Sequence, residues 1–204
     1  MKSLLEKDPN SLCYLRNPNS VLFVDDQNHA FFSPQYLATQ VITQEWVEPV
    51  DKIHKLFKAT SNVLDGNGNE IITAYPVERP DGQWSVMLIN KDENHDHSVR
   101  VEFDDPVTKQ TRFFTGTVDR IVFGAGEYQW HPDPTPVADA VQPSTQVAGN
   151  GQQGDAPAGR VRDYGHGDPD GPASKSTVMA DGPSTLYDLP KASIIVLRGS
   201  LRSQ

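Results

Sequence analysis

The chain has 204 residues, 36% of them hydrophobic, and a formal net charge of −9 at neutral pH. This length is enough for one large domain or two small ones with a buried core. The acidic balance argues against nucleic acid as a partner, because binding a phosphate backbone requires a basic surface.

Membrane and redox signals are weak in this sequence. No apolar run is long enough to cross a bilayer, so we expect no membrane partner. Residues 1–10 are too charged and too short to form the apolar region of a signal peptide. The sequence leaves the localisation open, and secretion as part of a larger parent enzyme is one of the alternatives. The single cysteine, Cys13, excludes an internal disulfide framework.

The first elements are a strand and a helix. Residues 20–32 carry an apolar run, a polar turn and a second apolar group, which predicts a short buried strand. Ser33 followed by Pro34 is typical of a helix start, because serine can cap a free N–H group and proline needs no partner there. Pro49 disfavours helical geometry at the preceding residue, so we expect the helix to end near Val47.

The rest of the chain has the pattern of short strands. Residues 71–77 and 84–90 flank a turn at 79–82 and predict a hairpin. Alternating or continuous apolar residues predict further strands at 99–103, 111–117, 119–123 and 193–198.

These spacings indicate a mainly β fold, an antiparallel β-sandwich, because no crossover helices separate the strands. A strand and a helix precede the sandwich. Residues 131 to about 185 contain 8 of the 16 prolines and 8 of the 15 glycines, with isolated apolar residues. We therefore expect a long irregular insertion there.

Several blocks of the sequence match a known arrangement. The best are residues 88–92, LINKD, and 189–199, LPKASIIVLRG, with support from 43–49, TQEWVEP, from 73–77, TAYPV, and from 79–84, RPDGQW. Together they resemble the C-terminal portion of retaining glycoside hydrolases with a TIM-barrel catalytic domain. The hydrolases in question are of the β-xylosidase, arabinofuranosidase and glucanase-xylanase kind. The resemblance covers nearly the whole chain apart from the insertion.

The resemblance implies a domain division. In that family an eight-stranded sandwich packs on the barrel, and residues 21–46 resemble only the last barrel strand and its helix. Residues 1–52 would then be a strand–helix remnant of the barrel, and 53–204 a β-sandwich accessory domain with a loop insertion at about 131–185. The two catalytic glutamates of the family belong to earlier barrel strands, and no position here matches them.

The expected function follows from that division. The chain would be a non-catalytic accessory domain of a polysaccharide-degrading enzyme, with a structural role and no cofactor, and inactive as an enzyme by itself. One alternative is a free-standing carbohydrate-binding module for xylan or cellulose, and another is a fragment that is active only with its missing barrel. The expected partners are an oligosaccharide or polysaccharide, and a catalytic barrel domain or a second copy of the chain.

Tyr128 and Trp130 are the candidate carbohydrate-binding residues. They lie two apart, so on an extended segment they would point the same way and offer aromatic faces to a sugar. The alternative is that they seal the sandwich core or a seam against the barrel. We expect any binding through them to be weak, in the millimolar range.

The titratable residues give weaker signals, and we assign no catalytic residue and no metal site. Glu45 and Glu48 flank a helix end, where solvated glutamates are ordinary. His95 and His97 could face a metal from an extended segment, but a solvated turn explains them as well. The Asp168–Gly171 turn has carboxylates and a glycine but lacks the further oxygen ligands of a calcium loop.

Overall fold

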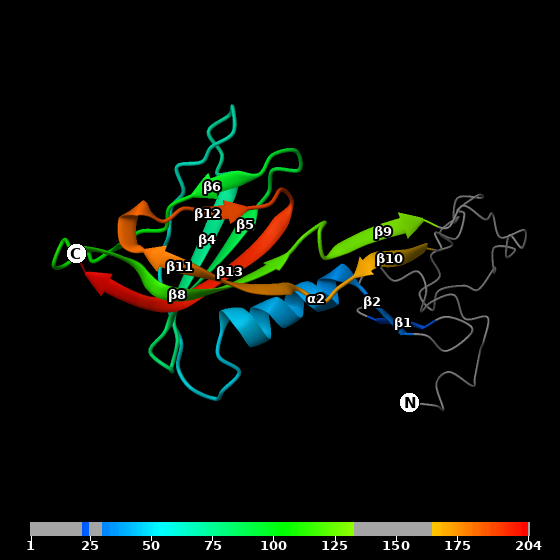
Figure 1. Cartoon of the computed structure of the whole chain (residues 1–204), viewed down its shortest axis with the longest axis horizontal. Coiled ribbons are helices and arrows are strands. Elements are labelled where there is room, and N and C mark those ends of the chain that lie inside the picture. The colour runs from blue at the N-terminus through cyan, green and yellow to red at the C-terminus, as the bar shows by residue number, and fades with distance from the viewer. Residues whose placement is uncertain (1–21, 25–29, 133–164, 204) are drawn as a thin grey trace, which may run out of the picture.

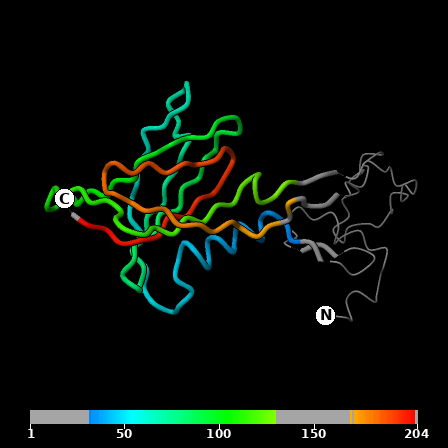
Figure 2. The backbone as a smooth tube through the Cα atoms, viewed as in Figure 1, coloured from blue at the N-terminus to red at the C-terminus, as the bar shows by residue number. Residues whose placement is uncertain are grey.

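The computed structural model describes residues 22–24, 30–132 and 165–203 of this chain (Figures 1 and 2). It is built mainly of antiparallel strands with one short helical segment, and it is sandwich-like without being closed. The predicted fold class is therefore confirmed. No helix in these described ranges is long and apolar enough to cross a membrane.

A seven-stranded antiparallel sheet forms the body of the fold. Its order is β11-β8-β13-β5-β4-β3, and β7 pairs with β8 off this path. The bounds are β3 Lys55–Leu56, β4 Ile72–Glu78, β5 Trp84–Asn90, β7 Phe103–Asp104, β8 Thr111–Phe123, β11 Ser174–Asp181 and β13 Ser193–Ser203.

Three two-stranded sheets accompany it. They pair β1 Leu22–Val24 with β2 Ala30–Phe32, β6 His97–Val99 with β12 Tyr187–Leu189, and β9 Tyr128–Pro132 with β10 Gly165–Asp170. A 3₁₀ turn at Gly182–Ser184 joins β11 to β12. In Figure 1 the β6–β12 pair lies across β4 and β5, and the β9–β10 ribbon extends away from the sheet.

One face of the large sheet packs against the β6–β12 pair. Ile195 and Leu197 of β13 and Leu189 of β12 have 0% exposed surface and belong to the same apolar cluster, which we call the first core cluster. Burial of apolar side chains from two sheets is what defines a sandwich core.

The opposite face is covered by the helical segment. It consists of the α-helix α2, Pro34–Gln40, and the π-helical turn η1, Val41–Trp46. Leu37 and Val41 are buried there with Met87, Ile121, Phe123 and Val196, which form the second core cluster. The apolar side of the helix is thus covered within the chain itself.

Polar contacts at both ends hold the helix in place. Ser33 caps its start, since the N–H of Tyr36 donates to Ser33 Oγ at 3.3 Å. At the other end the Trp46 indole N–H donates to the carbonyl oxygen of Tyr75 at 2.8 Å. The buried Arg79 guanidinium donates to the carbonyl oxygen of Glu45 at 2.9 Å. The predicted cap and the predicted end near Val47 are both confirmed.

The predicted hairpin is also confirmed, but four strand predictions differ from the structure. The single strand expected at 20–32 is an antiparallel pair, β1 and β2, and the strand expected at 99–103 is divided between β6 and β7. The strands expected at 111–117 and 119–123 are one strand, β8. A bulge replaces the break, where Gly116 adopts a φ of +73° that suits glycine.

The irregular insertion expected at 131–185 is wrong for its described parts. Residues 131–132 end β9, 165–170 form β10, and β11 pairs with β8 along its full length. β11 is an edge strand whose side chains are mostly exposed, so its composition is as polar as that of a loop. The remainder, 133–164, lies outside the described residues.

Leu37→Ala should test the contact between helix and sheet. Truncating a buried leucine removes apolar contacts and leaves a cavity, so we expect the free energy of unfolding to fall by about 2–5 kcal/mol. Gln35→Ala, on the exposed side of the same helix, should change it by less than about 0.5 kcal/mol. Urea unfolding followed by circular dichroism measures both, and equal effects would contradict the packing described here.

Candidate functional site

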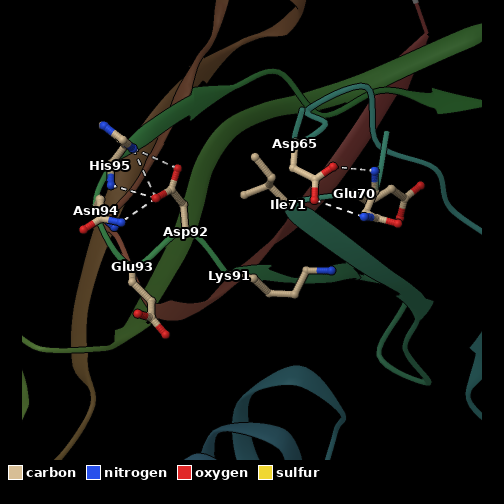
Figure 3. A pocket seen from close by; sticks show the side chains of 9 residues that line it. Asp65, Glu70, Ile71, Lys91, Asp92, Glu93, Asn94 and His95 are labelled. Carbon is tan, nitrogen blue, oxygen red and sulfur yellow. Dashed lines mark hydrogen bonds and ion pairs between the residues drawn. The ribbon is translucent and has the colours of Figure 1, made fainter. Parts of the chain in front are cut away.

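A shallow hollow of the described surface lies at the turns that flank β4 and β5. It measures about 510 Å³ and is open to solvent. Figure 3 shows Asp92 with Asn94 and His95 on one side, Asp65 and Glu70 on the other, and Lys91 between them. The lining residues are Asp65, Asn69, Glu70, Ile71, Lys91, Asp92, Glu93, Asn94 and His95.

Asp92 is the most heavily engaged carboxylate of the hollow. Its Oδ1 atom accepts from the backbone N–H groups of Asn94 at 2.9 Å and of His95 at 3.0 Å. Its Oδ2 atom accepts from Nε2 of His97 at 3.0 Å and from Nδ1 of His95 at 3.1 Å. The backbone N–H of Asn94 and then the His97 ring hold the pKa of Asp92 far below its ordinary value.

Asp65 has a similar role on the other side. It accepts from the backbone N–H groups of Asn67 and Asn69, both at 2.8 Å, and from the Asn69 side chain at 3.0 Å. The Asn69 side chain, followed by its backbone N–H, lowers the pKa of Asp65. Glu70 Oε1 accepts from the backbone N–H of Ser61 at 3.0 Å. These carboxylates therefore hold turns together.

This arrangement does not suit acid–base or metal chemistry. A general acid at neutral pH needs a raised carboxyl pKa, and the pKa values of Asp65 and Asp92 are lowered instead. The rings of His95 and His97 both face the Asp92 carboxylate, so the structure brings the two histidines together around an acceptor. Among the described residues, no group of three or more His, Cys, Asp and Glu side chains is arranged to hold a metal ion.

Glu45 belongs to an ion-pair network. Its Oε1 atom lies 2.5 Å from Nζ of Lys175, and its Oε2 atom lies 3.6 Å from Nη1 of Arg198. These contacts join the helical segment to β11 and β13. Glu48 is tied through its backbone N–H, which donates to Nε2 of His54 at 3.0 Å, and its Oε2 atom is buried with no hydrogen-bond partner in the described structure.

Tyr128 and Trp130 both lie in β9, where Tyr128 pairs with Asp170 and Trp130 with Gly167 of β10. The Tyr128 ring is half-buried against the second core cluster, 6.4 Å from the ring of Phe123. This position agrees with the sealing role that we considered for Tyr128. The Trp130 side chain lies outside the described structure.

The Asp168–Gly171 segment and Cys13 have little or no described geometry. Asp168 and Asp170 lie in β10, so the segment that we compared with a calcium loop is the end of a strand, and their side chains are outside the described structure. Cys13 also falls outside the described residues.

A row of aromatic rings is the feature that the sequence analysis missed. It runs from Tyr187, which is 3% exposed, to Phe57, which is 45% exposed. Burial raises the pKa of Tyr187 to about 12, which reflects how fully its ring is enclosed. Trp84 packs against the first core cluster. The centroid distances between successive rings are 4.8, 5.2, 5.1 and 6.3 Å for Phe57, Trp84, Phe103, Phe114 and Tyr187.

Asp92→Asn should test the structural role of the hollow. The folded-state pKa of Asp92 is lowered, so its stabilising contribution is fully present above the ordinary value of 3.8 and declines as the pH falls below it. We expect the variant to be less stable than the wild type at neutral pH, with a deficit that shrinks in acid. Glu93→Gln, an exposed neighbour, is the control. Urea unfolding from neutral to acidic pH measures the difference, and a deficit independent of pH would contradict this role.

Two comparisons with known proteins find no relative of this chain. A scan against protein-family models finds no match for the chain, and a search of curated proteins finds none either. The link to glycoside hydrolases therefore rests on the sequence blocks alone.

Proposed function

We propose that this chain is a non-catalytic β-sandwich accessory domain of a polysaccharide-degrading glycoside hydrolase. The observation that carries the proposal is the position of the two best-matching sequence blocks. They are about a hundred residues apart in the chain, and they meet at one joint of the sandwich.

That joint is made by one asparagine and the turn before β13. Asn90 ends β5 opposite Ser193 of β13. Its side-chain Nδ2 donates to the carbonyl oxygens of Leu189 at 3.2 Å and of Pro190 at 2.9 Å. The backbone N–H of Ala192 donates to the carbonyl oxygen of Asp92 at 2.8 Å. Asn90 is only 2% exposed, so these bonds satisfy a buried polar group. The two blocks that resemble the glycoside hydrolases are therefore in contact with each other in the folded chain. This contact supports the proposal that the blocks were retained together because they stabilise the sandwich.

The chemistry of the carboxylates supports a non-catalytic role. Retaining hydrolysis uses two carboxyl groups about 5–5.5 Å apart, of which one must be protonated. Among the residues that the structure describes, every carboxylate with a resolved change in pKa has a lowered pKa: Asp65, Asp81, Asp92 and Asp105. The Glu45 carboxylate forms ion pairs with Lys175 and Arg198 that join the helical segment to the sheet.

The second candidate function is a free-standing carbohydrate-binding module. The partly exposed ring at the end of the aromatic row favours it, because sugars stack on exposed aromatic faces. In this reading the chain would bind polysaccharide without a barrel domain. Tight retention on insoluble xylan or cellulose would favour this module over an accessory domain with a structural role.

An activity assay tests the proposal. The chain should not release product from aryl β-xylosides, β-glucosides or arabinofuranosides above the blank rate, and Glu45→Gln and Glu48→Gln should leave this result unchanged. Turnover that disappears in either variant would show that the chain is an enzyme. The variants must be folded by circular dichroism, since Glu45 also joins the helix to the sheet.

A further inference from the structure

We propose that the exposed ring of Phe57, at the open end of the aromatic row, is the binding platform for a β-linked pyranose oligosaccharide. This site is different from Tyr128 and Trp130. The nature of the ligand rests on the proposed function, and the inference goes further by placing the site on the β3 edge of the large sheet.

The ring of Phe57 is held at the surface by its neighbours. The backbone N–H of Phe57 donates to the carbonyl oxygen of Pro76 at 3.1 Å, which continues the pairing of β3 with β4. The ring centroid lies 4.8 Å from that of Trp84, with 32° between the planes, while 45% of the residue remains exposed. Trp84 therefore backs the ring on one side and leaves the rest to solvent.

The backing is rigid, which favours binding. Trp84 makes an edge contact with the buried Phe103 at 5.2 Å and 75°, and the Arg112 guanidinium lies 5.9 Å from the Trp84 ring. A ring fixed by a packed core loses little freedom when a ligand stacks on it. Its apolar face suits the C–H bonds of a pyranose, as aromatic faces do in general.

Polar groups for the sugar hydroxyls stand beside the platform. Lys55 and Glu78 form an ion pair at 3.1 Å, and their side chains are 65% and 34% exposed. Glu78 is the register partner of Trp84, and Lys55 lies two residues before Phe57, on the same side of the extended segment. An exposed amine and carboxylate next to an aromatic ring can donate to and accept from hydroxyl groups, which matches a neutral, hydroxyl-rich ligand.

The test is an NMR titration of the full chain with xylohexaose and with cellohexaose. The indole N–H signal of Trp84, assigned from a Trp84→Phe variant, should shift on saturation. Because one platform buries little area, we expect a dissociation constant on the order of 1 mM. Phe57→Ala should raise that constant by about tenfold or more. Phe57→Trp should retain binding.

Leu56→Ala is the matched control. Leu56 is the neighbouring apolar residue, is 65% exposed and points to the opposite face of β3, so its variant should bind like the wild type. Circular dichroism confirms that each variant is folded. A folded Phe57→Ala that binds normally would overturn the platform, as would a wild-type chain that binds neither sugar. Signal shifts confined to Tyr128 and Trp130 would also overturn it.

The experiment distinguishes failure of the Phe57 platform from failure of the proposed function. Absence of binding would remove the platform but leave a non-catalytic structural domain in place. Hydrolysis of an aryl glycoside would overturn the accessory function whether or not Phe57 binds sugar.

Discussion

Strand β13 is buried on both faces, and this double burial is the constraint on which the rest of the structure depends. Ile195, Val196 and Leu197 follow one another and are all 0% exposed. Successive side chains of a strand point to opposite faces, so Ile195 and Leu197 join the first core cluster and Val196 joins the second. A strand of this kind needs a cover on each side of the sheet. The β6–β12 pair supplies one cover and the helical segment supplies the other.

The helix is therefore an integral layer of the sandwich. Its apolar residues are directed to the second core cluster, while Gln35, Thr39 and Thr43 are exposed on the other side. An apolar inner face and a polar outer face are typical of a helix that covers a core on one side and contacts solvent on the other. The sheet itself ends at β11 on one edge and at the short β3 on the other. At β3 the covering layers no longer enclose the aromatic row, and Phe57 reaches the surface.

Local patterns in the sequence predicted the elements whose stability is local. The hairpin of β4 and β5 follows from alternation around a turn, and the helix start follows from Ser33 and Pro34. The β11 strand could not be predicted in this way, because an edge strand is stabilised by pairing with a distant partner and keeps a polar composition. The division of 99–103 into β6 and β7 also depends on distant partners, namely β12 and β8.

The site residues show the same limit. The contact of Glu45 with Lys175 spans 130 positions, so no spacing rule could reveal it. The proximity of His95 and His97 was visible in the sequence, but the shared Asp92 acceptor depends on the fold of the turn. Phe57 could not be predicted as a site, because β3 is only two residues long and shows no alternation of apolar and polar residues. Its exposure suggests a binding surface only together with the Trp84 ring, which lies 4.8 Å away and fixes its position.

Native-state hydrogen exchange of the full chain tests most directly whether the helix is part of the sandwich. Amides in buried, fully paired elements exchange through global unfolding, whereas weakly held elements open locally. The structure predicts that the amides of Ile195 to Leu197 exchange slowest and that those of Val41 and its helical neighbours require the same free energy of opening. Helix amides that exchange by local opening, at a much lower free energy than β13, would show that the helix is not held by the sheet.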